Sequence, residues 1–116
     1  MSQLMKVVEQ GEVVFEEGSA GRTFYYIQSG SVEVSRGTGS GRQVVATLGK
    51  GQSFGEYALL KEGDSTRSAT VTALERSLLV ELDRESLEEI LSEVPDFVND
   101  LIRSLVNQVI ELEGEE

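Results

Sequence analysis

The chain has 116 residues, enough for one folded domain with its own core but not for two. Hydrophobic residues make up 39% and charged residues 27%, as in folded proteins, and the lack of cysteine excludes disulfides. The lack of histidine as well removes the usual transition-metal ligands and most nucleophilic triads, and a net charge of −11 disfavours direct nucleic-acid binding.

Short apolar segments separated by glycines fill most of the chain. We expect strands at residues 5–8, 12–15, 23–28, 31–36, 43–48, 68–73 and 77–82. Ser29-Gly30 predicts a tight hairpin turn, and the glycine-rich residues 37–41 predict a second hairpin loop. Many short strands at a spacing of about 8–12 residues favour a sandwich or jelly roll.

The segment Phe54-Gly55-Glu56-Tyr57-Ala58-Leu59-Leu60, followed by Arg67-Ser68-Ala69-Thr70-Val71, has the parts of an anion site. Gly55 tolerates positive φ and lets the backbone approach a ligand. A short helix beginning near Glu56 presents N–H groups to an anion. Arg67 adds a forked, permanently charged donor, and the Glu56 carboxylate accepts hydrogen bonds from hydroxyl groups.

Each of these residues also has a simpler interpretation. Gly55 fits an ordinary turn, Glu56 fits a favourable partner for a helix dipole, and Arg67 fits a surface arginine in a loose ion pair. The whole motif is much less probable by chance than any one of its residues.

The last third of the chain changes to a helical period. Asp83 is a good N-cap for a helix over 84–93, and Pro95 ends it and precedes a second helix over 96–112. The apolar residues of the second helix come in pairs, at 97/98, 101/102, 105/106 and 109/110. This stripe fits either one broad core face or a face that also dimerises.

The 54–71 segment resembles the phosphate-binding cassette of the cyclic nucleotide-binding domain family. Phe15-Glu16-Glu17-Gly18-Ser19-Ala20-Gly21, then Phe24-Tyr25-Tyr26-Ile27 and Gly30-Ser31-Val32, resemble the family's F-x-x-G-x-x-G, Y-x-I and G-x-V framework. We interpret these framework glycines as turn positions that do not touch ligand. The resemblance covers residues 7–109.

The resemblance implies a mainly β fold: an eight-stranded jelly-roll β-barrel with a short cassette helix and two C-terminal helices. We expect one domain over 1–116, with the jelly roll at 1–82, the cassette at 54–71 and the helices at 83–113. The implied ligand is cAMP, with cGMP as the alternative. No catalytic residue, metal site or cofactor is expected.

The resemblance also assigns roles to residues at the cassette. Arg67 and the N–H groups of Tyr57 and Ala58 would hold the phosphate, and Glu56 would accept the ribose 2′-hydroxyl. Gly55 would give a backbone contact, and Ser68 a hydroxyl to phosphate or base. The base would rest on strand residues such as Val34 or Val45.

Three departures from the family pattern concern the cassette and the base lid. The 61–66 connection is longer than in many members, Thr66 replaces the common proline, and Leu112-Glu113 stand where a base-contacting Thr-Ser pair occurs. The identity of the base-capping residue therefore stays open.

The sequence predicts a regulatory module in which ligand binding moves the C-terminal helices. The alternative is a jelly roll that binds no nucleotide and serves protein interaction or dimerisation. No apolar run reaches about 18 residues, so no transmembrane helix and no membrane partner are expected. The lack of cysteine fits a cytoplasmic location. For partners, the sequence leaves open a homodimer through 96–112 and an output domain or partner protein outside this chain. Both a stand-alone sensor and a part of a larger protein fit the sequence.

Overall fold

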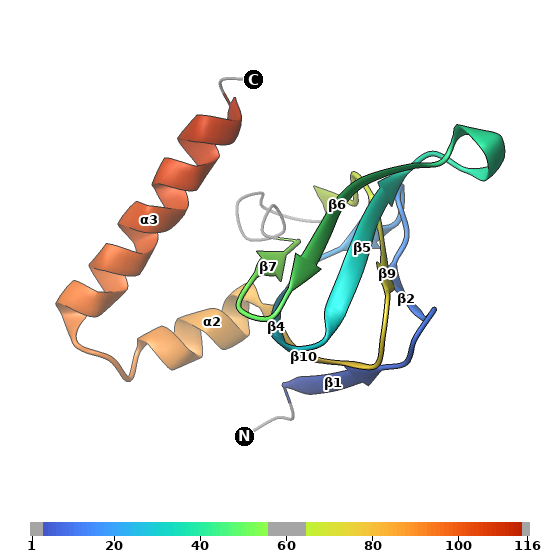
Figure 1. Ribbon diagram of the computed structural model, residues 1–116. Helices are drawn as coiled ribbons and strands as arrows, with labels where there is room; N and C mark the ends of the chain where they lie inside the picture. Colours follow the sequence, from blue (N-terminus) through green and yellow to red (C-terminus); the bar gives the residue numbers. More distant parts are fainter. Residues whose placement is uncertain (1–3, 56–64, 115–116) are drawn as a thin grey trace. The chain divides into compact units, whose positions relative to one another are not determined.

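The computed structural model describes residues 4–55 and 65–114, with no side chain described at Ser65 or beyond Leu105. Contacts within the chain divide it into two units, residues 1–84 and 85–116. The first unit is built of strands and the second of helices (Figure 1). The unit boundary lies within two residues of the strand-to-helix boundary expected from sequence, and the single domain over 1–116 stays a prediction.

Within the described residues, ten strands form two four-stranded sheets and a two-stranded ribbon, all antiparallel. The first sheet has the order β1 (Met5–Val8), β10 (Ser77–Asp83), β4 (Thr23–Ser29), β7 (Ser53–Phe54). The second has the order β2 (Val13–Phe15), β9 (Thr70–Ala73), β5 (Ser31–Arg36), β6 (Gln43–Gly49). The ribbon pairs β3 (Ala20–Gly21) with β8 (Ser65–Thr66).

This architecture confirms the mainly β, jelly-roll class. The two four-stranded sheets match the expected eight strands, and the ribbon is additional. The ribbon strands and β7 are only two residues long, too short to show the alternation from which a strand is predicted. The expected cassette helix falls outside the described residues.

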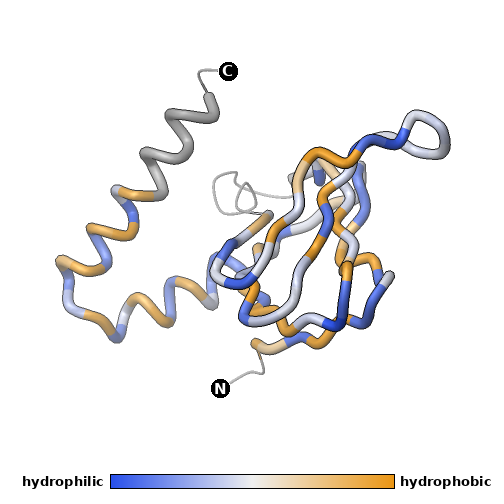
Figure 2. Tube along the Cα trace, in the orientation of Figure 1, coloured by the Kyte–Doolittle hydropathy of each residue, from blue (hydrophilic) through white to orange (hydrophobic). Residues whose placement is uncertain are grey.

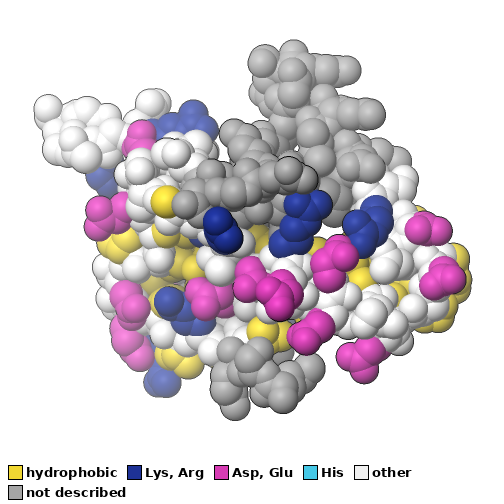
Figure 3. Space-filling view, turned by 180° about the vertical axis from the view of Figure 1, so that it is seen from behind, with side chains coloured by type: hydrophobic (Ala, Val, Ile, Leu, Met, Phe, Trp, Pro, Cys, Tyr) yellow, Lys and Arg dark blue, Asp and Glu magenta, His cyan; other side chains and the backbone are white. Residues whose placement is uncertain are grey.

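The core lies where the inward-facing residues of the strands meet. Hydrophilic and hydrophobic residues alternate along several strands (Figure 2), because successive side chains point to opposite faces of a sheet. The buried cluster consists of Val8, Tyr25, Ile27, Val32, Phe54, Val71, Ala73 and Leu79. The face of the protein shown in Figure 3 is a mixture of acidic and basic side chains with small hydrophobic areas.

The prediction of a hairpin turn at Ser29-Gly30 was wrong, because the two flanking strands belong to different sheets. These residues do not close a hairpin, because β4 pairs with β10 and β7 whereas β5 pairs with β6 and β9. Gly30 has φ +95°, and a Cβ there would overlap the Ser77 side chain and lie 2.7 Å from Ser77 Cα. Ser77 Oγ accepts a hydrogen bond from the Ser31 N–H at 3.1 Å. The chain therefore crosses from one sheet to the other at this corner.

The β5–β6 hairpin was predicted correctly, and its loop contains a 3₁₀ turn at Gly39–Gly41. Its register shifts once, where Val34 pairs with Ala46 but Ser35 pairs with Val44. Val45 is the extra residue of this bulge. Helix α2 spans Arg84–Leu91, directly after Asp83, and α3 spans Asp96–Gly114, close to the expected ranges.

The apolar residues of α3 fall into two groups that differ in solvent exposure. Val98 and Ile102 are half-buried, whereas Phe97, Leu101 and Leu105 are 70%, 53% and 51% exposed. Within the helical unit, Arg103 Nη2 lies 2.7 Å from Glu88 Oε1, and its Nε donates to Asn99 Oδ1 at 2.7 Å. These contacts join α3 to α2, while one apolar edge of α3 stays open to solvent.

Candidate functional site

Arg67 lies between β8 and β9, and its main chain is fixed by a distant turn. Its N–H donates to the Ser19 carbonyl and its carbonyl accepts from the Gly18 N–H, both at 2.8 Å. The β3–β8 ribbon continues this pairing on the other side of Ser19. The backbone that carries Arg67 is thus pinned to the segment that follows β2.

The Arg67 side chain is only 7% exposed. Its Cζ lies 4.0 Å from the centre of the Phe15 ring, in the geometry of a cation–π contact. Its Nη2 donates a hydrogen bond to Thr23 Oγ1 at 3.0 Å. The ring sets the plane of the guanidinium, and Thr23 fixes one of its terminal nitrogens.

The Nε of Arg67 is buried and has no hydrogen-bond partner among the described residues. Buried polar atoms are normally paired, so an orphaned one calls for an explanation such as an absent ion or ligand. Burial lowers the pKa of the Arg67 guanidinium, and electrostatic interactions with Tyr25 and Glu81 oppose that shift. An anion bound at Nε would satisfy this donor and offset the cost of burying its charge.

Two glycines make room for the guanidinium. A Cβ on Gly21 would overlap Nε and Nη2 of Arg67 and lie 2.6 Å from its Cζ. Gly55 has φ +82°, and a Cβ there would lie 3.3 Å from Arg67 Nη1. The positive φ expected at Gly55 is therefore present, whereas its approach to a ligand stays a prediction. For Gly21 the turn interpretation was wrong: its φ is not positive, and its lack of a side chain admits Arg67 instead.

The structure brings some of the sequence-predicted residues together. Gly55 and Arg67 are neighbours in space, and Ser68 follows Arg67 as an exposed residue of a bend. Phe15, Val71 and Val34 lie side by side on successive strands of one sheet, so Val34 is two strands away from the ring under Arg67. Val34 is half-buried against the core.

Other predicted residues are not placed at Arg67. Val45 is 48% exposed and is the extra residue of the β6 bulge. Glu56, Tyr57 and Ala58 lie outside the described residues. The roles of all these residues in ligand binding stay predictions.

Sequence reasoning missed three residues around Arg67, which are Phe15, Gly21 and Thr23. Phe15 and Gly21 are the first and last residues of the F-x-x-G-x-x-G segment, which was interpreted only as framework. The F-x-x-G-x-x-G spacing is the sequence signal that could have pointed to them. Gly21 lies in a strand and begins no turn, so turn geometry does not explain its place in that motif. Thr23 carries no local signal, because its role depends on a partner 44 residues away.

Within the described ranges, no helix is long and apolar enough to cross a membrane. In those same ranges, no three acidic side chains are grouped so as to hold a metal ion.

The chain belongs to the cyclic nucleotide-binding domain family, whose model matches residues 5–94. It is 42% identical over 95 residues to the cAMP-dependent protein kinase regulatory subunit of Yarrowia lipolytica, covering 82% of this chain and 24% of that protein. The crystal structure of the Thermus thermophilus catabolite activator protein superposes with a TM-score of 0.70 at 33% identity, covering 96% of this chain and 52% of that one.

A structure described as cAMP bound PfPKA-R (141-441) superposes with a TM-score of 0.66 at 39% identity, covering 74% of this chain and 30% of that one. The resemblance drawn from the cassette and framework motifs is therefore confirmed. The chain spans about a quarter of the length of the Yarrowia lipolytica subunit, so it matches one part of that longer protein.

Proposed function

We propose that this chain binds a cyclic nucleotide, cAMP or alternatively cGMP, and acts as a regulatory module. The observation that carries the proposal is the buried Arg67 Nε, which has no partner among the described residues and lies in a space left open by glycine. A cyclic phosphate is an anion with oxygens that accept from such a donor. Family membership supports the same ligand class.

The family pattern assigns the remaining contacts of this proposal. Glu56 accepts the ribose 2′-hydroxyl, and the N–H groups of Tyr57 and Ala58 join Arg67 at the phosphate. Gly55 lets the main chain approach the ligand, and Ser68 supplies an exposed hydroxyl next to Arg67. For the base, the half-buried Val34 is a better candidate for an apolar contact than Val45. Val34 and Phe15 are both register partners of Val71, so Val34 lies in line with the ring that contacts Arg67.

The proposed module is a sensor and not an enzyme, and it works in the cytoplasm. Its ligand must have different affinities for two arrangements of α2 and α3 if binding is to move those helices. Its output goes to a further domain or partner protein, without direct contact to nucleic acid or membrane by this chain. This assignment follows the acidic net charge of −11 and the regulatory names of its relatives.

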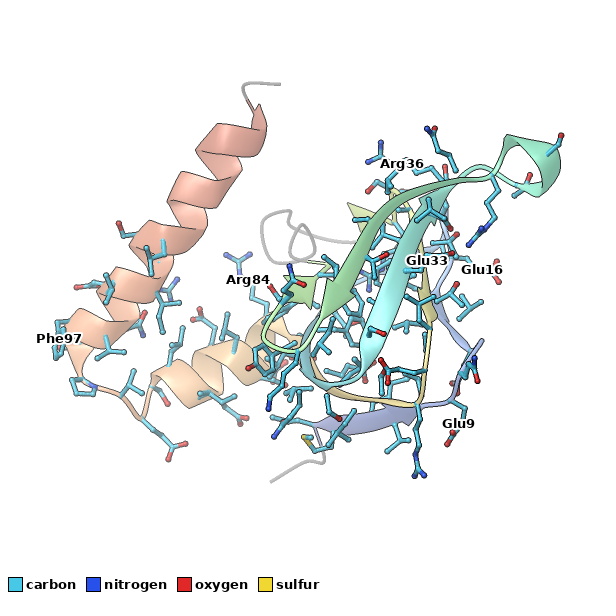
Figure 4. All side chains as sticks on the ribbon, viewed as in Figure 1. Glu9, Glu16, Glu33, Arg36, Arg84 and Phe97 are labelled. Carbon is cyan, nitrogen blue, oxygen red and sulfur yellow. The ribbon has the colours of Figure 1, made fainter. Side chains whose placement is uncertain are left out.

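Self-association through α3 is the second part of the proposal. Phe97 projects outward near the start of α3 (Figure 4), and Leu101 and Leu105 follow it at helical spacing. All three are more than half exposed. Burying such a row against a second copy removes apolar surface from water at about 25 cal/mol per Å².

The test is calorimetric titration with cAMP, cGMP and linear AMP. Wild type should bind a cyclic nucleotide, and Arg67→Ala should weaken binding by about 1.5–3 kcal/mol because a charge-assisted hydrogen bond is lost. Arg76→Ala is the matched control, since Arg76 is an exposed arginine whose ion pair is with Glu9. If wild type binds neither cyclic nucleotide, the alternative of a protein-interaction module without nucleotide replaces this proposal.

A further inference from the structure

A chain of hydrogen bonds runs from Arg67 to a carboxylate on β10. Arg67 Nη2 donates to Thr23 Oγ1 at 3.0 Å, Thr23 Oγ1 donates to the Tyr25 hydroxyl at 3.1 Å, and that hydroxyl donates to Glu81 Oε2 at 2.7 Å. A guanidinium can only donate and a carboxylate can only accept. Both hydroxyls are therefore oriented in one direction, and each bond polarises the next.

The middle of this chain is rigid. Thr23 and Tyr25 lie two residues apart on β4 and so point to the same face of the strand. The Tyr25 ring is stacked on the Phe54 ring with centroids 5.0 Å apart, and it is tilted against the Phe15 ring with centroids 6.0 Å apart. Burial raises the pKa of Tyr25 to about 12, which keeps its hydroxyl protonated as a donor at neutral pH. The position of this hydroxyl is thus set by aromatic packing.

Glu81 provides the distant end with a negative charge. It is the register partner of Tyr25 across β10 and β4, and its backbone N–H donates to the Leu4 carbonyl at 2.7 Å. Its carboxylate lies 3.9 Å from Lys6 Nζ, with both side chains over a third exposed, so that ion pair is weak. Among the described carboxylates, none lies within ion-pair distance of Arg67, and Glu81 is the one to which hydrogen bonds connect it.

An arginine side chain has many rotamers, and contact with the face of a ring does not stop it from sliding along that face. The bond to Thr23 holds Nη2, which leaves Nε as the buried donor without a described partner. The hydrogen bonds on the Tyr25 side keep the Thr23 hydroxyl turned with its lone pairs toward Arg67. Removing any link therefore loosens the guanidinium.

We infer that Thr23, Tyr25 and Glu81 are positioning residues that hold the Arg67 guanidinium with its Nε ready for an anionic ligand. This inference rests on the proposed function, in which that anion is the ligand phosphate. The competing explanation is that these hydrogen bonds only strengthen the pairing of β4 with β10. In that case substitutions in the hydrogen-bond chain would change the stability of the protein, and any effect on cAMP affinity would be the same with or without the Arg67 side chain.

The first experiment uses Tyr25→Phe, which keeps the stacked ring and removes the linking hydroxyl. The matched control is Tyr26→Phe, since Tyr26 is the next residue on β4, points to the opposite face and is 40% exposed. Tyr25→Phe removes both hydrogen bonds of this hydroxyl, to Thr23 and to Glu81, so it should weaken cAMP binding about threefold to tenfold and leave the control unchanged.

The same substitution is then made in an Arg67→Ala background, as a double-mutant cycle. Because Tyr25 acts through Arg67, its effect on cAMP affinity should disappear there. An equal loss of affinity in both backgrounds would overturn the inference, as would wild-type affinity in Tyr25→Phe itself.

The second experiment needs no ligand and compares Thr23→Val with Thr23→Ser. The nitrogen-15 NMR signal of Arg67 Nε–H should exchange slowly with solvent in wild type and in Thr23→Ser, which keeps a hydroxyl. In Thr23→Val the signal should shift and exchange faster, and an unchanged signal there would refute the positioning role. If wild type binds no cyclic nucleotide, the proposed function fails, while this comparison still decides whether Thr23 positions Arg67.

Discussion

Substituting Gly21 tests directly whether the guanidinium lies where the structure places it. Gly21→Ala adds one methyl group at a position whose φ is not left-handed, so the backbone itself accepts alanine. The new Cβ would overlap Nε and Nη2 of Arg67 and lie 2.6 Å from Cζ. Ordinary contact requires about 3.5 Å, so the guanidinium must move by roughly 1 Å.

The displacement has different effects on stability and on binding. Leaving the Phe15 ring and Thr23 loses a cation–π contact and a hydrogen bond, but the moved charge regains contact with water. The two effects offset in part, and we expect a loss of about 0.5–2 kcal/mol in the free energy of unfolding. The ligand phosphate loses a positioned, charge-assisted donor, so affinity for cAMP should fall by about 1.5–3 kcal/mol, roughly tenfold to a hundredfold.

Thermal unfolding without ligand and calorimetric titration with cAMP measure the two quantities separately. Gly41→Ala is the matched control, because Gly41 does not have positive φ and a Cβ there meets nothing within 4 Å. For a domain of this size, 1 kcal/mol corresponds to a shift of roughly 4 °C in Tm. If Gly21→Ala binds and melts like Gly41→Ala, the packing of Arg67 against Gly21 is not that of the protein in solution.

Two further predictions concern the sheet corner and the last helix. Ser77→Ala should lower the free energy of unfolding in urea by about 1–2 kcal/mol, because the part-buried Ser31 N–H loses its acceptor. The control Ser40→Ala, at an exposed serine, should not; equal urea midpoints for the two variants would show that Ser77 does not hold the corner. Leu101→Glu should abolish any dimer seen by sedimentation and leave cAMP affinity unchanged. The control Gln10→Glu adds the same charge at an exposed turn and should leave the dimer intact. A dimer that survives in Leu101→Glu excludes α3 as its interface.

The strands that the sequence predicted well are those whose own residues specify them. Ser31–Arg36 alternates strictly, and its bounds as β5 are those expected. Alternation, however, says which residues share a face and not which strand is the neighbour. The hairpin expected at Ser29-Gly30 failed for that reason, since the close approach of Ser77 at Gly30 joins residues far apart in sequence.

The site was predictable to a similar extent. Gly55 and Arg67 were found from a motif and do lie together. Phe15 and Thr23 contact the guanidinium only because the fold brings β2 and β4 to it, so no local pattern reveals their contacts with it. Gly21 shows that a glycine in a motif can serve an arginine rather than a turn.

The pinning of Arg67 to Gly18 and Ser19 also has a consequence for the order of folding events. Its side-chain partner Thr23 is 44 residues away in the chain, and the local hairpin between β5 and β6 forms entirely within the intervening segment. Contacts of such long sequence separation form after the loop between them has closed, and local pairs precede them. A chain in which only such local hairpins have formed has therefore not yet placed the Arg67 guanidinium against Thr23.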